Sequence, residues 1–116
     1  MSTVEAVRRI IRGHRWRLEV EATLQADIAA KLTAAAIAHE REVRLDAKNR
    51  IDFLIGSIGI EVKIKGAKRD IYRQVERYAA FDRISEVVLI TNVATRMPAT
   101  ICGKPIHVIP LTSALA

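Results

Sequence analysis

The sequence predicts an α/β domain in which helices cover a mixed β-sheet. Apolar and polar residues alternate over residues 51–55 and 58–64, as they do in strands with two different faces. Apolar residues recur at helical spacing over residues 18–38 and 70–82. Residues 86–92 are almost continuously apolar, which is typical of a strand buried on both faces. The order of helix, three strands, helix and two strands favours a sheet with helices on its faces.

Length and composition indicate one compact domain with a basic surface. The chain has 116 residues, of which 50% are hydrophobic, enough for a single core. Its net charge of +6 favours a polyanionic partner. Cys102 is the only cysteine, which excludes an intrachain disulfide, a zinc knuckle and a four-cysteine iron–sulfur cluster. No apolar run approaches the roughly 20 residues of a membrane span, so we expect a cytoplasmic protein without membrane contact.

Residues 1–17 are predicted to form a basic N-terminal arm, followed by one domain over residues 18–116. Apolar residues at helical spacing alternate in the arm with five arginines: Arg8, Arg9, Arg12, Arg15 and Arg17. Two compatible interpretations stay open, an arm that grips phosphates and a short docked helix with a solvated basic face. Trp16 is expected to anchor this segment to the domain or to a partner.

The helix expected over residues 18–38 carries a carboxylate on its inward face. Leu24, Ile28 and Leu32 mark the apolar face, and Glu21 falls on the same face near the helix start. A carboxylate in that position is costly unless it is solvated in a cleft, paired or bound to a metal. The alternative is that Glu21 only stabilises the helix N-terminus through the macrodipole.

A β-hairpin is the strongest pattern in the sequence. Ile51, Phe53 and Ile55 alternate with other residues along its first strand and are expected to share one face. Gly56-Ser57 separates the two strands and fits a type II′ turn, which has glycine at its first central position. This turn fixes which residues face each other across the hairpin.

In the predicted register, two carboxylates lie side by side. Asp52 faces Glu61, and Lys63 lies two residues beyond Glu61 on the same face. Like charges directly opposite each other destabilise a sheet, so we expect a cation to bridge them. A divalent metal ion with hard oxygen ligands is the obvious candidate.

The remaining elements complete the expected sheet and its cover. Residues 40–46 are predicted to form a polar first strand and residues 105–111 a last short strand, with residues 93–104 as a connection. Asp70 is the expected N-cap of the helix over residues 70–82.

That second helix turns polar as well as apolar side chains toward the sheet. Gln74 lies four residues before Tyr78 on the inward face. Taken singly, each of the two is better explained by core packing. Arginines at every fourth position form a basic ridge beside them: Arg69, Arg73 and Arg77.

The residues Asp52, Glu61 and Lys63, spaced as Asp-x8-Glu-x-Lys, resemble the motif of the PD-(D/E)XK nuclease superfamily, which has the restriction-endonuclease-like fold. Ile51 stands where the family name has proline. Glu21 matches the accessory acidic position upstream, and Gln74 with Tyr78 looks like the Gln-x-x-x-Tyr motif of the RecB-like branch. The resemblance spans residues 18–92, and the size and layout are also similar to VRR-Nuc and Holliday-junction-resolvase domains.

The resemblance implies a Mg²⁺-dependent nuclease, with Mn²⁺ as a substitute, that hydrolyses DNA phosphodiester bonds. It implies that Asp52, Glu61, Glu21 and the backbone carbonyl of Val62 hold the metal. Lys63 would stabilise charge or orient the attacking water, and Gln74 and Tyr78 would position the substrate. Basic residues would follow the nucleic-acid backbone: Arg50, Lys65, Lys68, Arg69, Arg73 and Arg77.

Because a small domain has little room for sequence-reading elements, we expect a structure-specific or weakly specific endonuclease. A homodimer would present two active sites to two strands. Two alternatives stay open: a non-catalytic nucleic-acid-binding module with the same fold, and a nuclease subunit that a partner activates.

Overall fold

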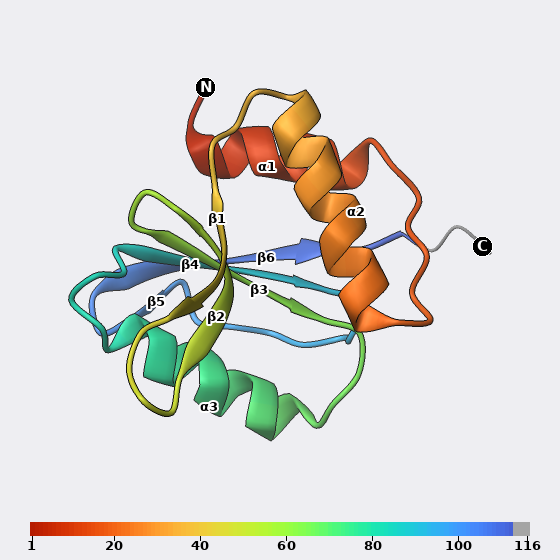
Figure 1. Ribbon diagram of the computed structural model, residues 1–116. Helices are drawn as coiled ribbons and strands as arrows, with labels where there is room; N and C mark the ends of the chain where they lie inside the picture. The colour runs from red at the N-terminus through yellow and green to blue at the C-terminus, as the bar shows by residue number, and fades with distance from the viewer. Residues whose placement is uncertain (113–116) are drawn as a thin grey trace.

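The computed structural model describes residues 1–112 and shows an α/β fold in which three helices flank a six-stranded mixed sheet. The helices are α1 (Thr3–Arg12), α2 (Glu21–Ala34) and α3 (Lys68–Ala79). The strands are β1 (Glu40–Arg44), β2 (Arg50–Ile55), β3 (Ile58–Lys63), β4 (Glu86–Thr91), β5 (Thr100–Ile101) and β6 (Lys104–Pro110). Helices α1 and α2 cover one face of the sheet and α3 covers the other (Figure 1). The predicted α/β class is confirmed.

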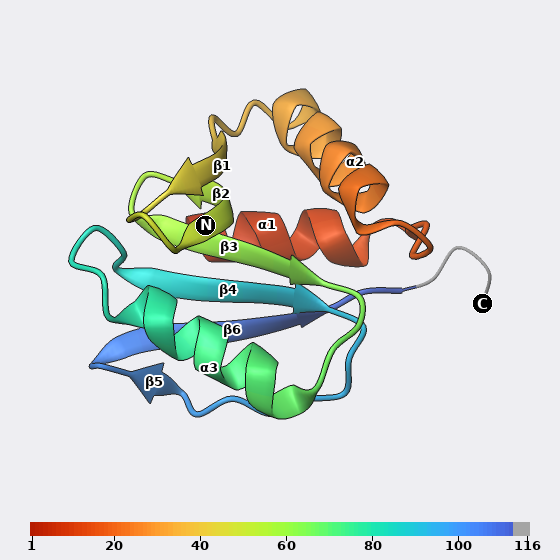
Figure 2. The ribbon, with the colours of Figure 1, turned by 60° about the horizontal axis from the view of Figure 1, so that its bottom comes forward.

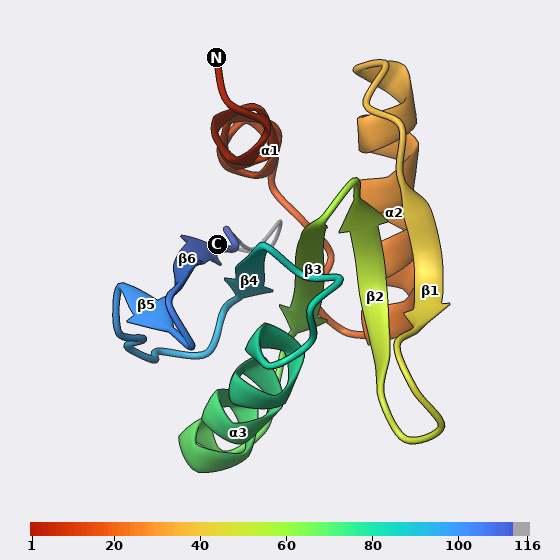
Figure 3. The same ribbon diagram turned by 90° about the vertical axis from the view of Figure 1, so that its left-hand side faces the viewer.

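The strands lie in the order β1-β2-β3-β4-β6-β5. Strands β1, β2 and β3 form an antiparallel meander and stand side by side in sequence order (Figure 3). Strands β3, β4 and β6 are parallel, and their arrowheads point the same way in Figure 2. Helix α3 makes the crossover from β3 to β4, so the carboxyl ends of these two strands meet at one edge, where Lys63 pairs with Thr91.

Two hydrophobic clusters lie on the two faces of the sheet. Ile60 and Val62 of β3 pack with α1 and α2. Val87 and Leu89 of β4, next to β3, pack with α3. Because side chains alternate along a strand, Glu61, between Ile60 and Val62, is directed to the α3 side.

The N-terminal segment is built into the first of these clusters. Val4, Val7 and Ile11 of α1 are buried there, and so is Trp16. The Trp16 indole donates a hydrogen bond to the Ile11 carbonyl at 3.0 Å. The docked-helix interpretation therefore describes residues 1–17, while four of its arginines stay exposed: Arg9, Arg12, Arg15 and Arg17. Of the domain predicted over residues 18–116, the last four residues lie outside the described part.

Helix α2 is shorter at both ends than the predicted 18–38. It begins after Val20, which is extended with φ −129°. It ends in a Schellman motif, in which the N–H of Ile37 donates to the Leu32 carbonyl and that of Ala36 to the Thr33 carbonyl. Ala36 takes the left-handed conformation, φ 58°, that glycine usually supplies there. Because alanine favours helices and no glycine marks the C-terminus, the sequence did not predict that α2 ends here.

The predicted N-cap of α3 is wrong. Ala67 is the N-cap, without a side-chain hydrogen bond, and Asp70 lies inside the first turn. In that position its carboxylate can still interact favourably with the positive end of the helix macrodipole. The helix also ends earlier than the predicted residue 82, at Ala79, with Ala80 as its C-cap.

The expected connection over residues 93–104 contains a strand that the sequence did not predict. Strand β5 pairs antiparallel with β6, Thr100 with Pro105 and Ile101 with Lys104. Cys102 and Gly103 between them both have positive φ, 54° and 72°, as a type I′ hairpin turn requires. A strand of two residues is too short to show alternation.

Within residues 1–112, no helix combines the length and the apolar character that crossing a membrane requires.

The packing of Trp16 predicts that the N-terminal segment contributes to stability. Replacing it, Trp16→Ala, should lower the free energy of unfolding by about 3–5 kcal/mol, because a buried indole is lost. The exposed neighbour provides the control, since Arg17→Ala should change it by less than about 0.5 kcal/mol. Urea denaturation followed by circular dichroism measures both. Equal stability of wild type and Trp16→Ala would show that the segment folds independently of the core.

Candidate functional site

The central hairpin has the predicted register near its turn. Phe53 pairs with Ile60, and the pairs continue to the turn at Gly56. Gly56 has φ +60°, while Ser57 is not among the residues with positive φ. This pattern is that of a type II′ turn, as predicted.

Beyond Phe53, side chains replace backbone groups in the pairing of β2 and β3. The Asp52 N–H donates to Oε1 of Glu61 at 3.2 Å. The Val62 N–H donates to Oδ2 of Asp52 at 2.9 Å. Each carboxylate thus accepts a hydrogen bond from the backbone of the opposite strand, and the two predicted residues lie together.

The strand β2 changes face at this point, which differs from the prediction. Ile51 packs in the cluster under α3 and Phe53 in the cluster under α1 and α2, so they do not share a face. On β1, Glu42 lies between the residues that pair with Ile51 and Phe53, and it has a left-handed φ of 50°. The distortion therefore involves both strands at the level of Asp52.

Burial makes the charges of this pair costly. Glu61 is only 3% exposed. Burial, followed by the charge of Asp52, raises the pKa of Glu61 to about 8. Burial also raises the pKa of Asp52, although the hydrogen bond from Val62 opposes this. Lys63 offsets part of the cost, with Nζ at 3.7 Å from Oε2 of Glu61.

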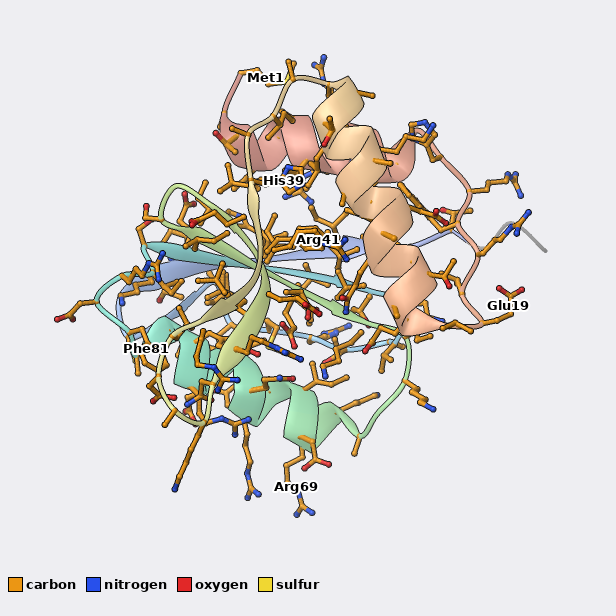
Figure 4. The ribbon with its side chains drawn as sticks, in the orientation of Figure 1. Met1, Glu19, His39, Arg41, Arg69 and Phe81 are labelled. Atoms are coloured by element: carbon orange, nitrogen blue, oxygen red, sulfur yellow. The ribbon has the colours of Figure 1, made fainter. Side chains whose placement is uncertain are left out.

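Glu21 reaches the same end of the hairpin from the first turn of α2. Its Oε1 accepts a hydrogen bond from the Ile64 N–H, just beyond β3, at 3.2 Å. Its charge contributes to the raised pKa of Asp52. Glu19, two residues earlier, is exposed and points away from the molecule (Figure 4). The structure thus brings Glu21 near the pair, and its place at the helix start fits the macrodipole alternative as well.

Helix α3 supplies a hydrogen-bonded chain on the other side of the pair. The Gln74 amide donates to the Tyr78 hydroxyl at 2.9 Å, and this hydroxyl donates to the Arg50 carbonyl at 2.9 Å. Tyr78 is buried, and burial followed by the charges of Glu61 and Asp52 raises the pKa of its hydroxyl above the usual range. Tyr78 therefore holds the start of β2 in place, whereas Gln74 is partly exposed.

The basic residues expected to contact nucleic acid lie on the surface. Arg77 of the ridge donates from Nε to Oδ1 of Asn49 at 3.3 Å and so connects α3 to the β1–β2 turn. All six are exposed: Arg50, Lys65, Lys68, Arg69, Arg73 and Arg77. Figure 4 shows Arg69 extending into solvent from the start of α3.

Thr91 is a site residue that the sequence analysis did not identify. It is buried at the end of β4, beside Lys63. Its hydroxyl donates to the Lys63 carbonyl at 2.6 Å and accepts from the Val93 N–H at 3.0 Å. The sequence gives a partial signal, since Thr91 is a lone hydroxyl at the end of an apolar run, but its place beside Lys63 follows only from the pairing of β3 with β4.

The site offers oxygen ligands of the type that Mg²⁺ prefers. Within the described residues, however, these oxygens do not point at a common position where an ion would bind. Within residues 1–112, no three His, Cys, Asp or Glu side chains come together in a way that would hold a metal ion. Asp52, Glu61 and Glu21 each direct an oxygen at a backbone N–H. A cation would nevertheless relieve the cost of two buried charges.

Comparison with known proteins finds no protein-family model, no curated protein and no solved structure that matches the chain.

The raised pKa of Glu61 predicts how stability depends on pH. The folded state binds this proton more tightly than the unfolded state, where the pKa is near 4.5, so stability is greatest below that value and falls as pH rises toward about 8. In EDTA, the wild type should lose on the order of a few kcal/mol over this range. Glu61→Gln, which cannot ionise, should reduce the loss, as should millimolar Mg²⁺. Urea denaturation at several pH values measures this, and equal slopes for wild type and variant would contradict it.

The position of Thr91 predicts a second effect on stability. Thr91→Val leaves the Lys63 carbonyl and the Val93 N–H without their partner, at a cost of about 1–3 kcal/mol. Thr91→Ser keeps the hydroxyl and should retain most of the stability. If thermal unfolding shows Val and Ser variants to be equally stable, the hydroxyl does not hold this edge.

Proposed function

We propose that the chain is a metal-dependent nuclease that hydrolyses DNA phosphodiester bonds, built on the restriction-endonuclease-like fold. The observation that carries the proposal is the interlocked pair of Asp52 and Glu61, joined by hydrogen bonds between β2 and β3 with Lys63 beside it. The buried Glu61, the half-buried Asp52 and Lys63 lie where β2 begins and β3 ends, and metal-dependent phosphodiester hydrolysis can use groups of these kinds.

The order of elements supports the proposed fold. From α2 onward, the chain runs helix, three antiparallel strands, helix and parallel strands, with α1 and the short β5 in addition. This agrees with the αβββαββ order expected from the resemblance. The antiparallel meander brings Asp52 and Glu61 together, and the crossover through α3 brings Tyr78 within reach of their charges, with Gln74 hydrogen-bonded to Tyr78.

The residues available for metal binding are Asp52, Glu61 and the backbone carbonyl of Val62, with Glu21 directly or through water. When bound there, Mg²⁺ or Mn²⁺ supplies the charge that offsets the phosphate and lowers the pKa of a water molecule. The carboxylates would hold the ion and orient the water. Lys63, half-buried with Nζ beside Glu61, stabilises the negative charge that develops on the phosphate. Gln74, partly exposed and hydrogen-bonded to Tyr78, would position the substrate strand.

The small size of the domain favours recognition of DNA structure over sequence. The exposed arginines and lysines on α3 and the loop before it supply contacts to phosphates, which position a protein without selecting a sequence. Two copies of the chain, one on each strand, would cleave a symmetric substrate, and we propose a homodimer for this reason.

One observation favours a second candidate function. The three acids direct oxygens at backbone N–H groups and do not form a ligand set within the described residues. This arrangement suits a subunit that a partner or its substrate activates, or a nucleic-acid-binding module without catalysis.

Cleavage assays test the proposal. Purified protein with Mg²⁺ or Mn²⁺ should cut at least one of a panel of labelled DNA substrates comprising single strands, duplexes, flaps and four-way junctions. Asp52→Asn and Lys63→Ala should each lower the rate by about 100-fold or more, because each removes a group that stabilises the transition state.

Glu21 and Glu19 form a matched pair for the same assay. Glu21→Gln should reduce cleavage, whereas Glu19→Gln, which removes an equal charge from the outer surface, should leave it unchanged. If the wild type cuts no substrate and calorimetry detects no Mg²⁺ binding, the enzyme proposal fails. Cleavage that appears only after a cell extract is added would favour the partner-activated subunit.

A further inference from the structure

A groove separate from the acidic pair lies beside the first turns of α3. Its walls are the start of α3 and the segment between β4 and β5, which pass next to each other in Figure 2. The groove has a volume of about 650 Å³ and is lined by Lys68, Arg69, Tyr72, Ala94, Thr95 and Arg96. That volume lies in the range of sites that bind small ligands, about 300–1,000 Å³.

The basic side chains of the groove form no salt bridges within residues 1–112. They are Lys68, Arg69 and Arg96, and all three are exposed. Asp70, the acidic residue of the first turn of α3, does not line the groove. The groove therefore has a net positive lining.

An aromatic ring lies among these cations. Tyr72 is 36% exposed, and it is the one aromatic residue among the large hydrophobic side chains that stay exposed in residues 1–112. Lys68 and Arg69 precede it by one helical turn and so lie on the same side of α3. Arg96 closes the groove from the opposite wall.

We propose that this groove binds single-stranded nucleic acid, with an unpaired base stacked on Tyr72 and phosphates bound by Lys68, Arg69 and Arg96. Proteins that bind single strands combine a positive groove with aromatic side chains on which bases stack. The bases of a duplex are stacked on one another and do not offer their faces. The groove therefore discriminates by strandedness, and its role as part of a substrate path rests on the proposed nuclease function.

The groove and the acidic pair lie on different sides of α3. Gln74 donates to Tyr78 on the sheet side of α3, and Tyr72, two residues before Gln74, lies about 200° away around the helix at 3.6 residues per turn. Lys63 and Thr91 end neighbouring strands, and the groove begins just beyond them, between the α3 start and the segment after β4. A strand leaving the pair at Lys63 would pass the first turn of α3 to enter the groove. Changes in the groove can therefore be made without altering Asp52 or Glu61.

Binding assays in EDTA test the groove without any cleavage. Fluorescence anisotropy is measured with labelled single-stranded DNA, single-stranded RNA and duplex DNA. Tyr72→Ala should weaken binding of a single strand by about 5- to 150-fold, the loss of one stacked base, and should leave duplex binding unchanged. Tyr72→Phe keeps the aromatic face and should stay within about twofold of the wild type. The DNA and RNA arms show which single strand is preferred.

Charge variants supply a second line of evidence. Arg96→Gln should weaken single-strand binding and reduce the slope of log affinity against log salt by about 0.7, the value for one phosphate contact on a single strand. Arg83, after the opposite end of α3, pairs with Glu40 at 3.7 Å. Arg83→Gln removes an equal charge there and should change neither quantity.

The outcomes separate this proposal from the nuclease proposal. The groove proposal fails if Tyr72→Ala changes single-strand affinity less than twofold, weakens duplex binding equally, or is matched by Tyr72→Phe. It also fails if the wild type binds no single strand. If Tyr72 and Arg96 show the expected effects while no substrate is cleaved, the groove stands and the nuclease function falls. If the wild type cleaves DNA while Tyr72→Ala changes single-strand affinity less than twofold, the nuclease function stands and the groove proposal falls.

Discussion

The crossed hydrogen bonds between β2 and β3 are the constraint on which the candidate site depends. Asp52 accepts from the Val62 N–H and donates its own N–H to Glu61. In an ordinary antiparallel pair, carbonyl groups would accept these bonds. An apolar residue at either position would leave a buried N–H without a partner, which costs as much as a lost hydrogen bond. The bonds that complete the hairpin thus also hold both carboxylates in place.

The same arrangement is unfavourable for charge. The hydrogen bonds that Asp52 and Glu61 accept are set against the cost of burying their charges, because buried ionised groups gain less from their partners than they lose in hydration. Burial raises both pKa values, and Lys63 offsets only part of the cost. A proton or a cation shared by the pair removes the remaining repulsion. Costly acids held rigidly at a strand end are better explained by a ligand than by folding.

The periodicity of the sequence predicted the long elements, and the misses have local causes. The alternation of apolar and polar residues predicted the hairpin, and the Gly56-Ser57 turn predicted its register and the proximity of Asp52 and Glu61. The alternation failed at Ile51, where β1 and β2 are both irregular and Glu42 on β1 has a left-handed φ, because no local sequence pattern indicates such an irregularity. Helix α2 starts after the extended Val20 and ends before the left-handed Ala36, and the identities of these residues do not predict such backbone conformations. Thr91 could be placed beside Lys63 only once the parallel pairing of β3 and β4 was known.

Basic side chains make one edge of the sheet favourable for phosphate. Strands β3 and β4 end there, and α2 and α3 both begin there, with Glu21 bonded to the Ile64 N–H and Lys68 just beyond. A helix start carries a partial positive charge of about half a unit, and Glu21 and Asp70 in the two first turns offset it. The positive charge of this edge therefore comes from its basic side chains, Lys63, Lys65, Lys68 and Arg69. Asp52 and Glu61 are recessed behind this edge, on the strands themselves. If the proposed function holds, a polyanion would approach this positive edge and bring its phosphate to Asp52 and Glu61, which would otherwise repel it.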